Sequence, residues 1–213
     1  MIALGLDPSL TGFGWCLHEN SVVGPRRVIA RGQIKTTSGK LIYQRYMYLY
    51  DGLLQLLEKY SDRFVYVGVE SPPFGESYSE GLYGLFLYVN QALMLYRKNV
   101  VYFDPMRVKS LAKMDPTMRK GVMDKSDMVE ASKADTGIKK WNHNEADAYI
   151  ISRSAARFWQ YQRGDIVDSA LTPSELSIYP SILKKPNDRF YLFEDLFPDQ
   201  DSVFKRTLLE LGD

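Results

Sequence analysis

Three acidic residues stand where a predicted buried element begins or ends. Asp7 follows the apolar residues 2–6, and Glu70 follows the apolar residues 64–69. Asp147 lies near the start of a long amphipathic segment. A charge beside apolar chain is costly unless it is paired or bound to a metal ion. Carboxylate oxygens are ligands that Mg²⁺ and Mn²⁺ prefer, so these residues would form a metal site if folding brings them together.

Two of these carboxylates also have a simpler interpretation. Asp7 stands before Pro8 and could only form a turn, and Glu70 could emerge into solvent where its strand ends. The two prolines that follow Ser71 favour a site edge for Glu70, because proline cannot continue a strand ladder.

The residues around Asp147 offer further ligands. Asn144 and Asp147 are three residues apart, so they share one face of a helix near its start. His143 stands four residues before Asp147 and could bind in place of Asn144. Asn144 could also cap the helix, and capping and binding do not exclude each other. Glu145 points to another side of the helix, where we expect it to face solvent.

The turn after Asp7 could contact a phosphate. Ser9 and Thr11 offer hydroxyls, and Gly12 offers a backbone N–H. Similar turns occur in sugar kinases and actin-like proteins. Those folds need two such domains, and 213 residues leave no room for both.

The apolar pattern predicts an α/β fold that would position these residues. Three closely spaced strands, at 2–6, 12–18 and 28–35, indicate an antiparallel meander. Two more strands, at 64–69 and 100–103, complete a mixed five-stranded sheet. Helical spacing recurs in the segments that flank the sheet, which are 40–60, 80–97, 105–113, 124–134 and 142–163.

Composition excludes several classes of protein. The single cysteine, Cys16, rules out an intrachain disulfide and a zinc site built from cysteines. No apolar stretch approaches the roughly 20 residues of a membrane helix. The N-terminus lacks the basic region of a signal peptide. We therefore predict a cytoplasmic protein with no membrane segment.

Charge is distributed unevenly along the chain. The formal net charge is only +1, yet residues 97–140 hold eleven Lys/Arg and six Asp/Glu, a net of +5. Residues 165–213 hold five Lys/Arg against ten Asp/Glu, which leaves a net of +6 for residues 1–164. A basic body fits a polyanionic partner, although a solvated helical surface can have the same composition.

The combination of motifs resembles the RuvC-type Holliday junction resolvases of the ribonuclease H-like superfamily. Asp7 with the glycine-bearing turn behind it resembles the first motif of that family, and Glu70 at its strand end resembles the second. The segment from Asn144 to Ala148 resembles the last motif, which is normally acidic-x-x-Asp-Ala. The resemblance covers residue 1 to about residue 160.

This resemblance implies an endonuclease that nicks branched DNA symmetrically. Asp7, Glu70 and Asp147 would hold two Mg²⁺ ions roughly 3.5–4 Å apart, with Mn²⁺ as an alternative. We expect a ribonuclease H-like nuclease domain over residues 1–164. Residues 165–213 would form an acidic, irregular C-terminal extension that could mimic DNA, shield the groove or bind a protein partner, after a helix start at Thr172.

The resemblance also implies contacts with DNA and with a second subunit. Lys109 and Lys125 would contact phosphates, and Phe74 would stack on unpaired bases. Their simpler roles are exposed helix lysines and a loop anchor. A homodimer would match the two-fold symmetry of a four-way junction. Its interface, or else the core, could use the apolar stripe of the 80–97 helix, which consists of Leu82, Leu85, Phe86, Val89, Leu93 and Tyr96.

One position departs from the pattern. Asn144 stands where the family has an acidic residue, so the site would carry one negative charge fewer. We expect either a weaker metal affinity or a site that includes His143 and favours Mn²⁺. The departure keeps a second function open, that of a catalytically weak junction-binding or architectural DNA protein. Ribonuclease H activity would use the same carboxylates, but the lysine segments favour the resolvase.

Overall fold

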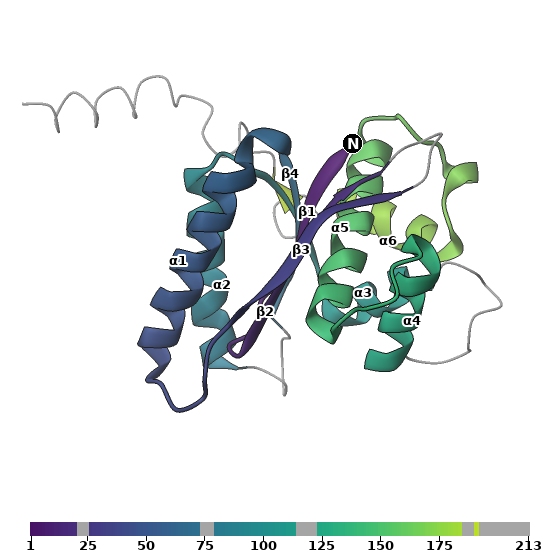
Figure 1. The fold of residues 1–213 in the computed structure, drawn as a ribbon. Coiled ribbons are helices and arrows are strands. Elements are labelled where there is room, and N and C mark those ends of the chain that lie inside the picture. The colour runs from purple at the N-terminus through teal and green to yellow at the C-terminus, as the bar shows by residue number, and fades with distance from the viewer. Residues whose placement is uncertain (21–25, 73–78, 114–122, 185–189, 192–213) are drawn as a thin grey trace, which may run out of the picture.

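The computed structural model describes residues 1–20, 26–72, 79–113, 123–184 and 190–191 of the 213-residue chain. The strands are β1 (Ile2–Asp7), β2 (Gly12–Glu19), β3 (Arg27–Lys35), β4 (Tyr66–Glu70), β5 (Asn99–Phe103) and β6 (Phe190–Tyr191) (Figure 1). The helices are α1 (Ile42–Tyr60), α2 (Glu80–Leu95), α3 (Pro105–Ala112), α4 (Lys125–Thr136), α5 (His143–Gln162) and α6 (Pro173–Leu183). Two short 3₁₀ helices are η1 (Ser61–Arg63) and η3 (Asp168–Ala170).

The strands form one mixed sheet in the order β3-β2-β1-β4-β5-β6. β1, β2 and β3 are the predicted antiparallel meander, while β4 pairs in parallel with both β1 and β5. The predicted α/β fold with a mixed five-stranded sheet flanked by helices is confirmed. The two-residue β6 adds a sixth strand that the sequence did not predict, and it pairs antiparallel to β5.

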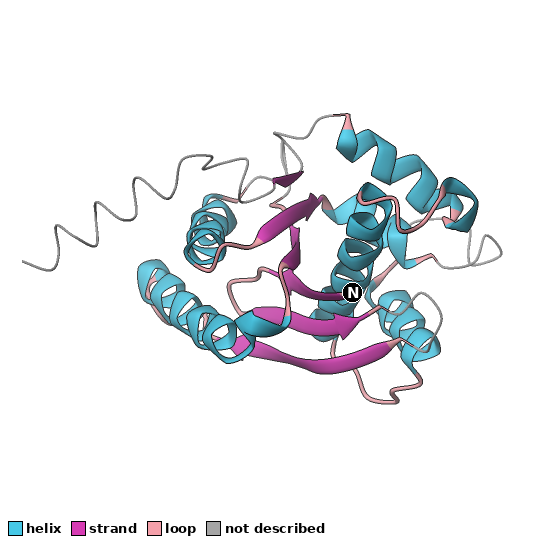
Figure 2. Ribbon diagram, turned by 90° about the horizontal axis from the view of Figure 1, so that it is seen from above, coloured by secondary structure: helices cyan, strands magenta, loops and turns pink. Residues whose placement is uncertain are grey.

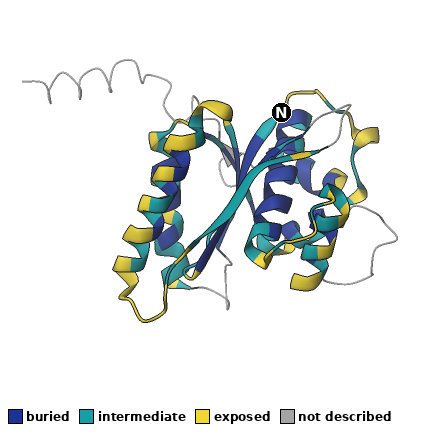
Figure 3. Ribbon diagram, viewed as in Figure 1, coloured by how far each residue is buried: buried dark blue, intermediate teal, exposed yellow. Residues whose placement is uncertain are grey.

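Helices cover both faces of the sheet (Figures 1 and 2). Leu4 and Leu6 of β1 belong to the core that contains α1 and α2. Ala3, which points to the other face because strand side chains alternate, belongs to the core that contains α3, α4, α5 and α6. The dark blue of α5 in Figure 3 shows that this helix is the most deeply buried one.

Glycines let α5 lie directly on the backbone of the sheet. A Cβ added to Gly5 would come closer than 3.0 Å to the carbonyl oxygen of Ala148, and one added to Gly14 would come equally close to the carbonyl oxygen of Asn144. Real Cβ atoms do not approach other atoms so closely. The small residues of β1 and β2 therefore fix how close the first turns of α5 lie to the sheet.

Part of the apolar stripe of α2 takes the core role that the sequence left open. Leu85, Val89 and Leu93 are buried in the core beneath α1 and α2, so these three side chains cannot contact another subunit. The exposed apolar side chains of α2 are instead Leu87 and Leu95. A helix that packs on a sheet buries one face in the core. The periodicity of its apolar residues does not show which of them face the core and which stay exposed.

The first part of the acidic extension forms helix α6, which packs against α5. The predicted capping box is present, because Thr172 Oγ1 accepts the N–H of Glu175 while Glu175 Oε2 accepts the N–H of Thr172. Pro180 lies inside α6, not in an irregular segment as predicted. The reason is that Tyr179 and Ile182 are fully buried against the α5 core, which outweighs the lost helical N–H. None of the helices in the described part of the chain has the length and apolarity needed to cross a bilayer.

Candidate metal centre

Asp7 and Glu70 end two neighbouring parallel strands. Asp7 is the last residue of β1 and Glu70 is the last residue of β4. The register that pairs Leu6 with Val69 brings the two carboxylates to adjacent positions at one edge of the sheet. Both residues are partly buried. The buried strands thus place two acidic side chains side by side, as their sequence positions predict.

Asp147 reaches the same edge from α5. The helix is capped by Asn142, whose Oδ1 accepts the N–H of Glu145 at 2.8 Å. The cap is therefore not Asn144, which lies inside the first turn with its Nδ2 over the backbone of Gly12. Because the first turns of α5 rest on the glycines of β1 and β2, Asp147 comes within electrostatic reach of Asp7 and Glu70.

The three carboxylates form a partly buried acidic cluster. Burial, and then the charges of Glu70 and Asp147, raise the pKa of Asp7 well above its usual range. Burial and the charge of Asp147 raise the pKa of Glu70 to about 7. Burial raises the pKa of Asp147 to about 6. Desolvated like charges of this kind need cations to remain ionised at neutral pH.

Two lysines supply part of that positive charge. Lys109 of α3 lowers the pKa of Glu70 and of Asp147, against the larger effect of burial. Lys125, the first residue of α4, acts in the same way on Asp7 and Asp147. Both predicted lysines therefore lie in the electrostatic field of the carboxylates. Lysines beside an acidic cluster are also suited to bind phosphate groups.

The donors fit Mg²⁺ in chemistry, although their side chains are not gathered around one point. Within the ranges described, no three His, Cys, Asp or Glu side chains come close enough together to hold one ion. Three carboxylates repel one another, and a divalent cation would have to draw them together. The three side chains offer the hard oxygen donors that Mg²⁺ prefers. A bound cation would also relieve their mutual repulsion.

His143 has a hydrogen bond that suits a metal ligand. Its Nδ1 lies 3.2 Å from the backbone carbonyl oxygen of Lys125. A carbonyl can only accept, so Nδ1 carries a proton in that contact, and a neutral ring would present the lone pair of Nε2 to a metal ion. Metal-binding histidines commonly use their second nitrogen in this way. The charge of His143 also lowers the pKa of Asp147, which places the ring beside the cluster.

The remaining predicted residues have different positions. Ser9 Oγ accepts the N–H of Gly12 at 3.4 Å, so its hydroxyl stabilises the turn after β1. Thr11 is exposed in that turn, and its carbonyl oxygen accepts the N–H of Thr36. Phe74 lies outside the described residues. In the part of the chain that the structure describes, neither Ser9 nor Thr11 has a hydrogen bond to the three carboxylates.

Sequence reasoning missed three polar residues near the cluster. Gln33 of β3 lies with Asn144 over Gly12, because a Cβ there would come closer than 3.0 Å to both side-chain amides. Asp104, the cap of α3, raises the pKa of Glu70. Arg31 of β3 pairs with Glu145 at 3.0 Å, at the start of α5. Only the Asp104-Pro105 helix start had a sequence signal; the positions of Gln33 and Arg31 depend on sheet register.

That ion pair corrects the expectation that Glu145 faces solvent. Arg31 Nη1 lies 3.0 Å from Glu145 Oε2, and Arg31 Nη2 donates to the Lys140 carbonyl oxygen at 2.6 Å. The guanidinium also lies 4.0 Å from the ring centroid of Trp141. Arg31 thus joins β3 to the start of α5, the helix that carries Asp147.

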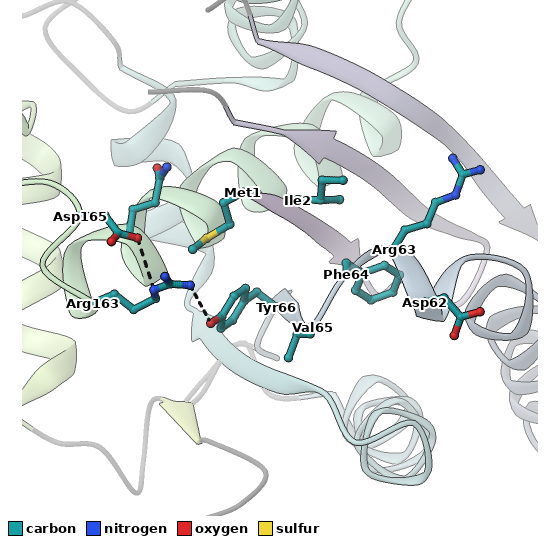
Figure 4. A pocket seen from close by; sticks show the side chains of 10 residues that line it. Met1, Ile2, Asp62, Arg63, Phe64, Val65, Tyr66, Arg163 and Asp165 are labelled. Carbon is teal, nitrogen blue, oxygen red and sulfur yellow. Dashed lines mark hydrogen bonds and ion pairs between the residues drawn. The ribbon is translucent and has the colours of Figure 1, made fainter. Parts of the chain in front are cut away.

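A hollow elsewhere does not include these residues. It has a volume of ≈620 Å³ and lies at the opposite ends of β1 and β4, where Met1, Phe64 and Tyr66 contribute to its lining (Figure 4). Arg163 there lies 3.3 Å from Asp165. Since Asp7 and Glu70 end these same strands, the hollow and the acidic cluster lie at opposite edges of the sheet.

The comparisons with known proteins rest on structure. No protein-family model matches the chain, and no curated protein matches its sequence. RuvC of Thermus thermophilus in complex with a Holliday junction substrate is 21% identical, with 78% of this chain and 96% of that chain covered and a TM-score of 0.61. Another structure of Thermus thermophilus RuvC is 19% identical, with coverage of 76% and 96% and a TM-score of 0.61.

A eukaryotic protein has the same fold. The yeast mitochondrial Holliday junction resolvase Ydc2 is 13% identical, with 76% of this chain and 80% of that chain covered and a TM-score of 0.50. At such identities the likeness concerns the fold. The chain therefore has the RuvC-type, ribonuclease H-like fold that its motifs predicted.

Proposed function

We propose that this protein is a Holliday junction resolvase, a metal-dependent endonuclease that nicks branched DNA. The observation that carries the proposal is the meeting of Asp7, Glu70 and Asp147 at one sheet edge of a RuvC-type fold, beside Lys109 and Lys125. The three acidic residues come from β1, β4 and α5, so only the complete fold assembles them.

Asp7, Glu70 and Asp147 would hold two Mg²⁺ ions, with His143 Nε2 or the Asn144 amide oxygen as a further donor. Bound ions of this kind lower the pKa of a water molecule and stabilise a leaving oxygen during phosphodiester hydrolysis. The protein's own part is to orient the three carboxylates and to shield them partly from bulk water. His143 in the ligand set would favour Mn²⁺ more than an all-oxygen site does.

The cationic residues would place the DNA strand. Lys109 and Lys125 would neutralise phosphates on either side of the cleaved bond, because each already interacts with two of the carboxylates. Ser9 and Thr11 would contact the backbone from the turn after β1, and Phe74 would stack on an unpaired base. These contacts position the strand without reading its sequence.

We propose a homodimer because the substrate, a four-way junction, is symmetric. Two nicks related by a two-fold axis need two sites related by the same axis. The apolar side chains that remain exposed on α2, Leu87 and Leu95, are available for that contact. A nuclease domain over residues 1–164 and a protein-binding role for the acidic extension remain part of the proposal.

The test is cleavage of a labelled synthetic four-way junction and of the matching linear duplex. Reactions contain Mg²⁺, Mn²⁺ or a chelator, and use the wild type, Asp7→Asn and, as a matched control, Asp62→Asn at the exposed opposite edge. We expect paired symmetric nicks in the junction alone, lost in chelator and in Asp7→Asn but retained in Asp62→Asn. Cleavage that persists in chelator would refute the proposal.

The second candidate is a junction-binding protein with weak catalysis. It is favoured by one observation, the neutral Asn144 at a position where the resembling family is acidic. Tight binding of the junction by the wild type, with no nick in either metal, would support this function and refute the nuclease.

A further inference from the structure

Residues 26–50 form a second basic segment that the candidate site does not explain. They contain no Asp or Glu, whereas the whole chain has nearly equal numbers, 26 acidic and 27 basic. The structure makes this segment into β3, which is an edge strand of the sheet, and the first half of α1. The basic side chains of the segment are Arg26, Arg27, Arg31, Lys35, Lys40 and Arg45.

Two of these cations are neutralised by acidic residues from elsewhere. Arg26 pairs with Asp135, and Arg31 pairs with Glu145. Arg27, Lys35 and Lys40 are exposed. Residues 26–50 thus leave exposed cations without an acidic residue among them, while the second half of α1 carries the exposed Asp51 and Glu58 together with Lys59.

Aromatic side chains stand among the cations. Tyr43 is 59% exposed and Tyr48 is 51% exposed on the outer side of α1, together with Met47. The ammonium group of Lys40 lies 5.1 Å from the ring centroid of Tyr48. In Figure 3 this lower end of α1 is coloured as exposed. Exposed tyrosines interleaved with lysines are the side chains with which proteins hold unpaired nucleic-acid strands.

A hollow joins the two elements. It has a volume of ≈410 Å³ between α1 and β3, and its lining consists of Gln33, Ile34, Lys35, Tyr48, Asp51, Gly52 and Gln55. Asp51 is its one acidic group and accepts a hydrogen bond from Gln55 at 2.9 Å. An aromatic face, a cation and several hydrogen-bonding groups thus border the same open space.

The two elements that border the hollow also contact segments of the candidate metal centre. Gln33 lines it, and the side-chain amide of Gln33 lies over Gly12 beside that of Asn144. On the other side, Arg45 of α1 donates to the carbonyl oxygen of Leu10 at 3.3 Å, in the turn that follows β1. These contacts fix α1 and β3 to the two segments that bear Asp7 and Asp147.

We propose that the β3–α1 hollow binds an unpaired nucleic-acid strand, with Tyr43 and Tyr48 stacked on bases and Lys35 and Lys40 on phosphates. The proposal deepens the proposed function, because it supplies a path for a strand that leaves a branch point next to the metal centre. A second copy of the chain is the other occupant that the test distinguishes, through the oligomeric state of the variants.

The test is binding of a fluorescent oligothymidylate of about 12 nucleotides, within the usual site sizes of such surfaces. Fluorescence anisotropy is measured in chelator with the full chain, so no nuclease activity is needed. Tyr43→Leu and Tyr48→Leu keep an apolar, helix-forming side chain but lose the ring, while Tyr43→Phe and Tyr48→Phe keep it. We expect each leucine variant to bind roughly five- to tenfold more weakly and each phenylalanine variant to bind like the wild type.

Charge variants test the phosphate contacts. Replacing both lysines, Lys35→Gln with Lys40→Gln, should reduce the slope of log affinity against log salt by about 1.4. Lys59→Gln, at the exposed far end of α1, is the matched control and should leave the slope unchanged. Circular dichroism of every variant confirms that the fold is retained.

Three results would overturn the proposal. One is wild-type protein that does not bind the oligothymidylate, and a second is leucine variants that bind as tightly as the wild type. The third is a change from dimer to monomer in the leucine variants without any loss of binding, which would make this face a subunit interface. The junction-cleavage assay is read separately, so loss of the resolvase proposal would leave this binding result interpretable.

Discussion

Replacing Glu70 with glutamine should stabilise the metal-free protein at alkaline pH. The pKa of Glu70 is raised from 4.5 to about 7, first by burial and then by the charge of Asp147. Because the folded state binds a proton more tightly than the unfolded state, stability falls as the pH rises from about 4.5 to about 7. At 1.36 kcal/mol per pKa unit, the ionised carboxylate costs about 3 kcal/mol above pH 7. Glu70→Gln removes that cost while keeping nearly the same shape.

The measurement is thermal unfolding in chelator at about pH 5 and about pH 8. For a chain of this size, 3 kcal/mol corresponds to a rise in melting temperature of about 6–12 °C at the higher pH. At the lower pH the two proteins should differ by less than about 1 kcal/mol, since Glu70 is protonated in the folded wild type. Glu58→Gln, on the exposed side of α1, is the control and should show no difference that depends on pH.

Adding Mg²⁺ provides the second half of this experiment. An ion that binds only the folded state raises the free energy of unfolding by an amount that grows with the ratio of the ion concentration to its Kd. The wild type should gain stability from Mg²⁺, and Glu70→Gln should gain much less because one ligand is lost. Equal melting temperatures of the two proteins at both pH values in chelator would refute the partly buried acidic cluster at this sheet edge.

Three further outcomes test other parts of the structure. Gly14→Ala should lower stability and abolish junction cleavage, because its Cβ would displace the start of α5, whereas Gly39→Ala, with no atom within 4 Å, should change neither. His18 is fully buried, neither ring nitrogen has a hydrogen-bond partner among the described residues, and burial lowers its pKa to about 3, so the wild type should lose up to about 5 kcal/mol between pH 6.5 and pH 3. His18→Leu should flatten this loss in a pH series of denaturant unfolding; an unchanged acid transition would contradict the assignment. Asn144→Asp should lower the Mg²⁺ concentration needed for half-maximal cleavage severalfold, and an unchanged metal titration would show that position 144 lies outside the ligand set.

The sequence predicted the sheet because short segments that are apolar or alternate in polarity are bounded by turn residues. The apolar residues of β1 and β4 end at Asp7 and Glu70, so the positions of both carboxylates could be read from the chain. Parallel pairing of these two strands, with helices on both faces, follows from the order of elements. The start of α5, and with it the position of Asp147, could be read from the polar residues that precede its apolar pattern.

The misses have a common physical cause, because they depend on contacts between distant elements. Gln33 reaches Asn144 only through the register of β3 on β2, in which Gln33 pairs with Gly14. Glu145 was expected in solvent because helical geometry alone cannot show Arg31 approaching from an edge strand. The core positions of α2 and the helical position of Pro180 were decided by packing partners far away in the chain.

The position of α5 on the sheet also has a consequence for folding. β1 can pair with β2 as soon as a hairpin forms, but its partner β4 and the helix α5 arrive much later along the chain. Loop closure over such separations is slow compared with local pairing. During synthesis, which proceeds from the N-terminus, Asp7 and Glu70 can be in place before Asp147 has been made. A partly synthesised chain therefore holds an incomplete set of carboxylates, and docking of α5 both closes the core and completes the acidic cluster in one step.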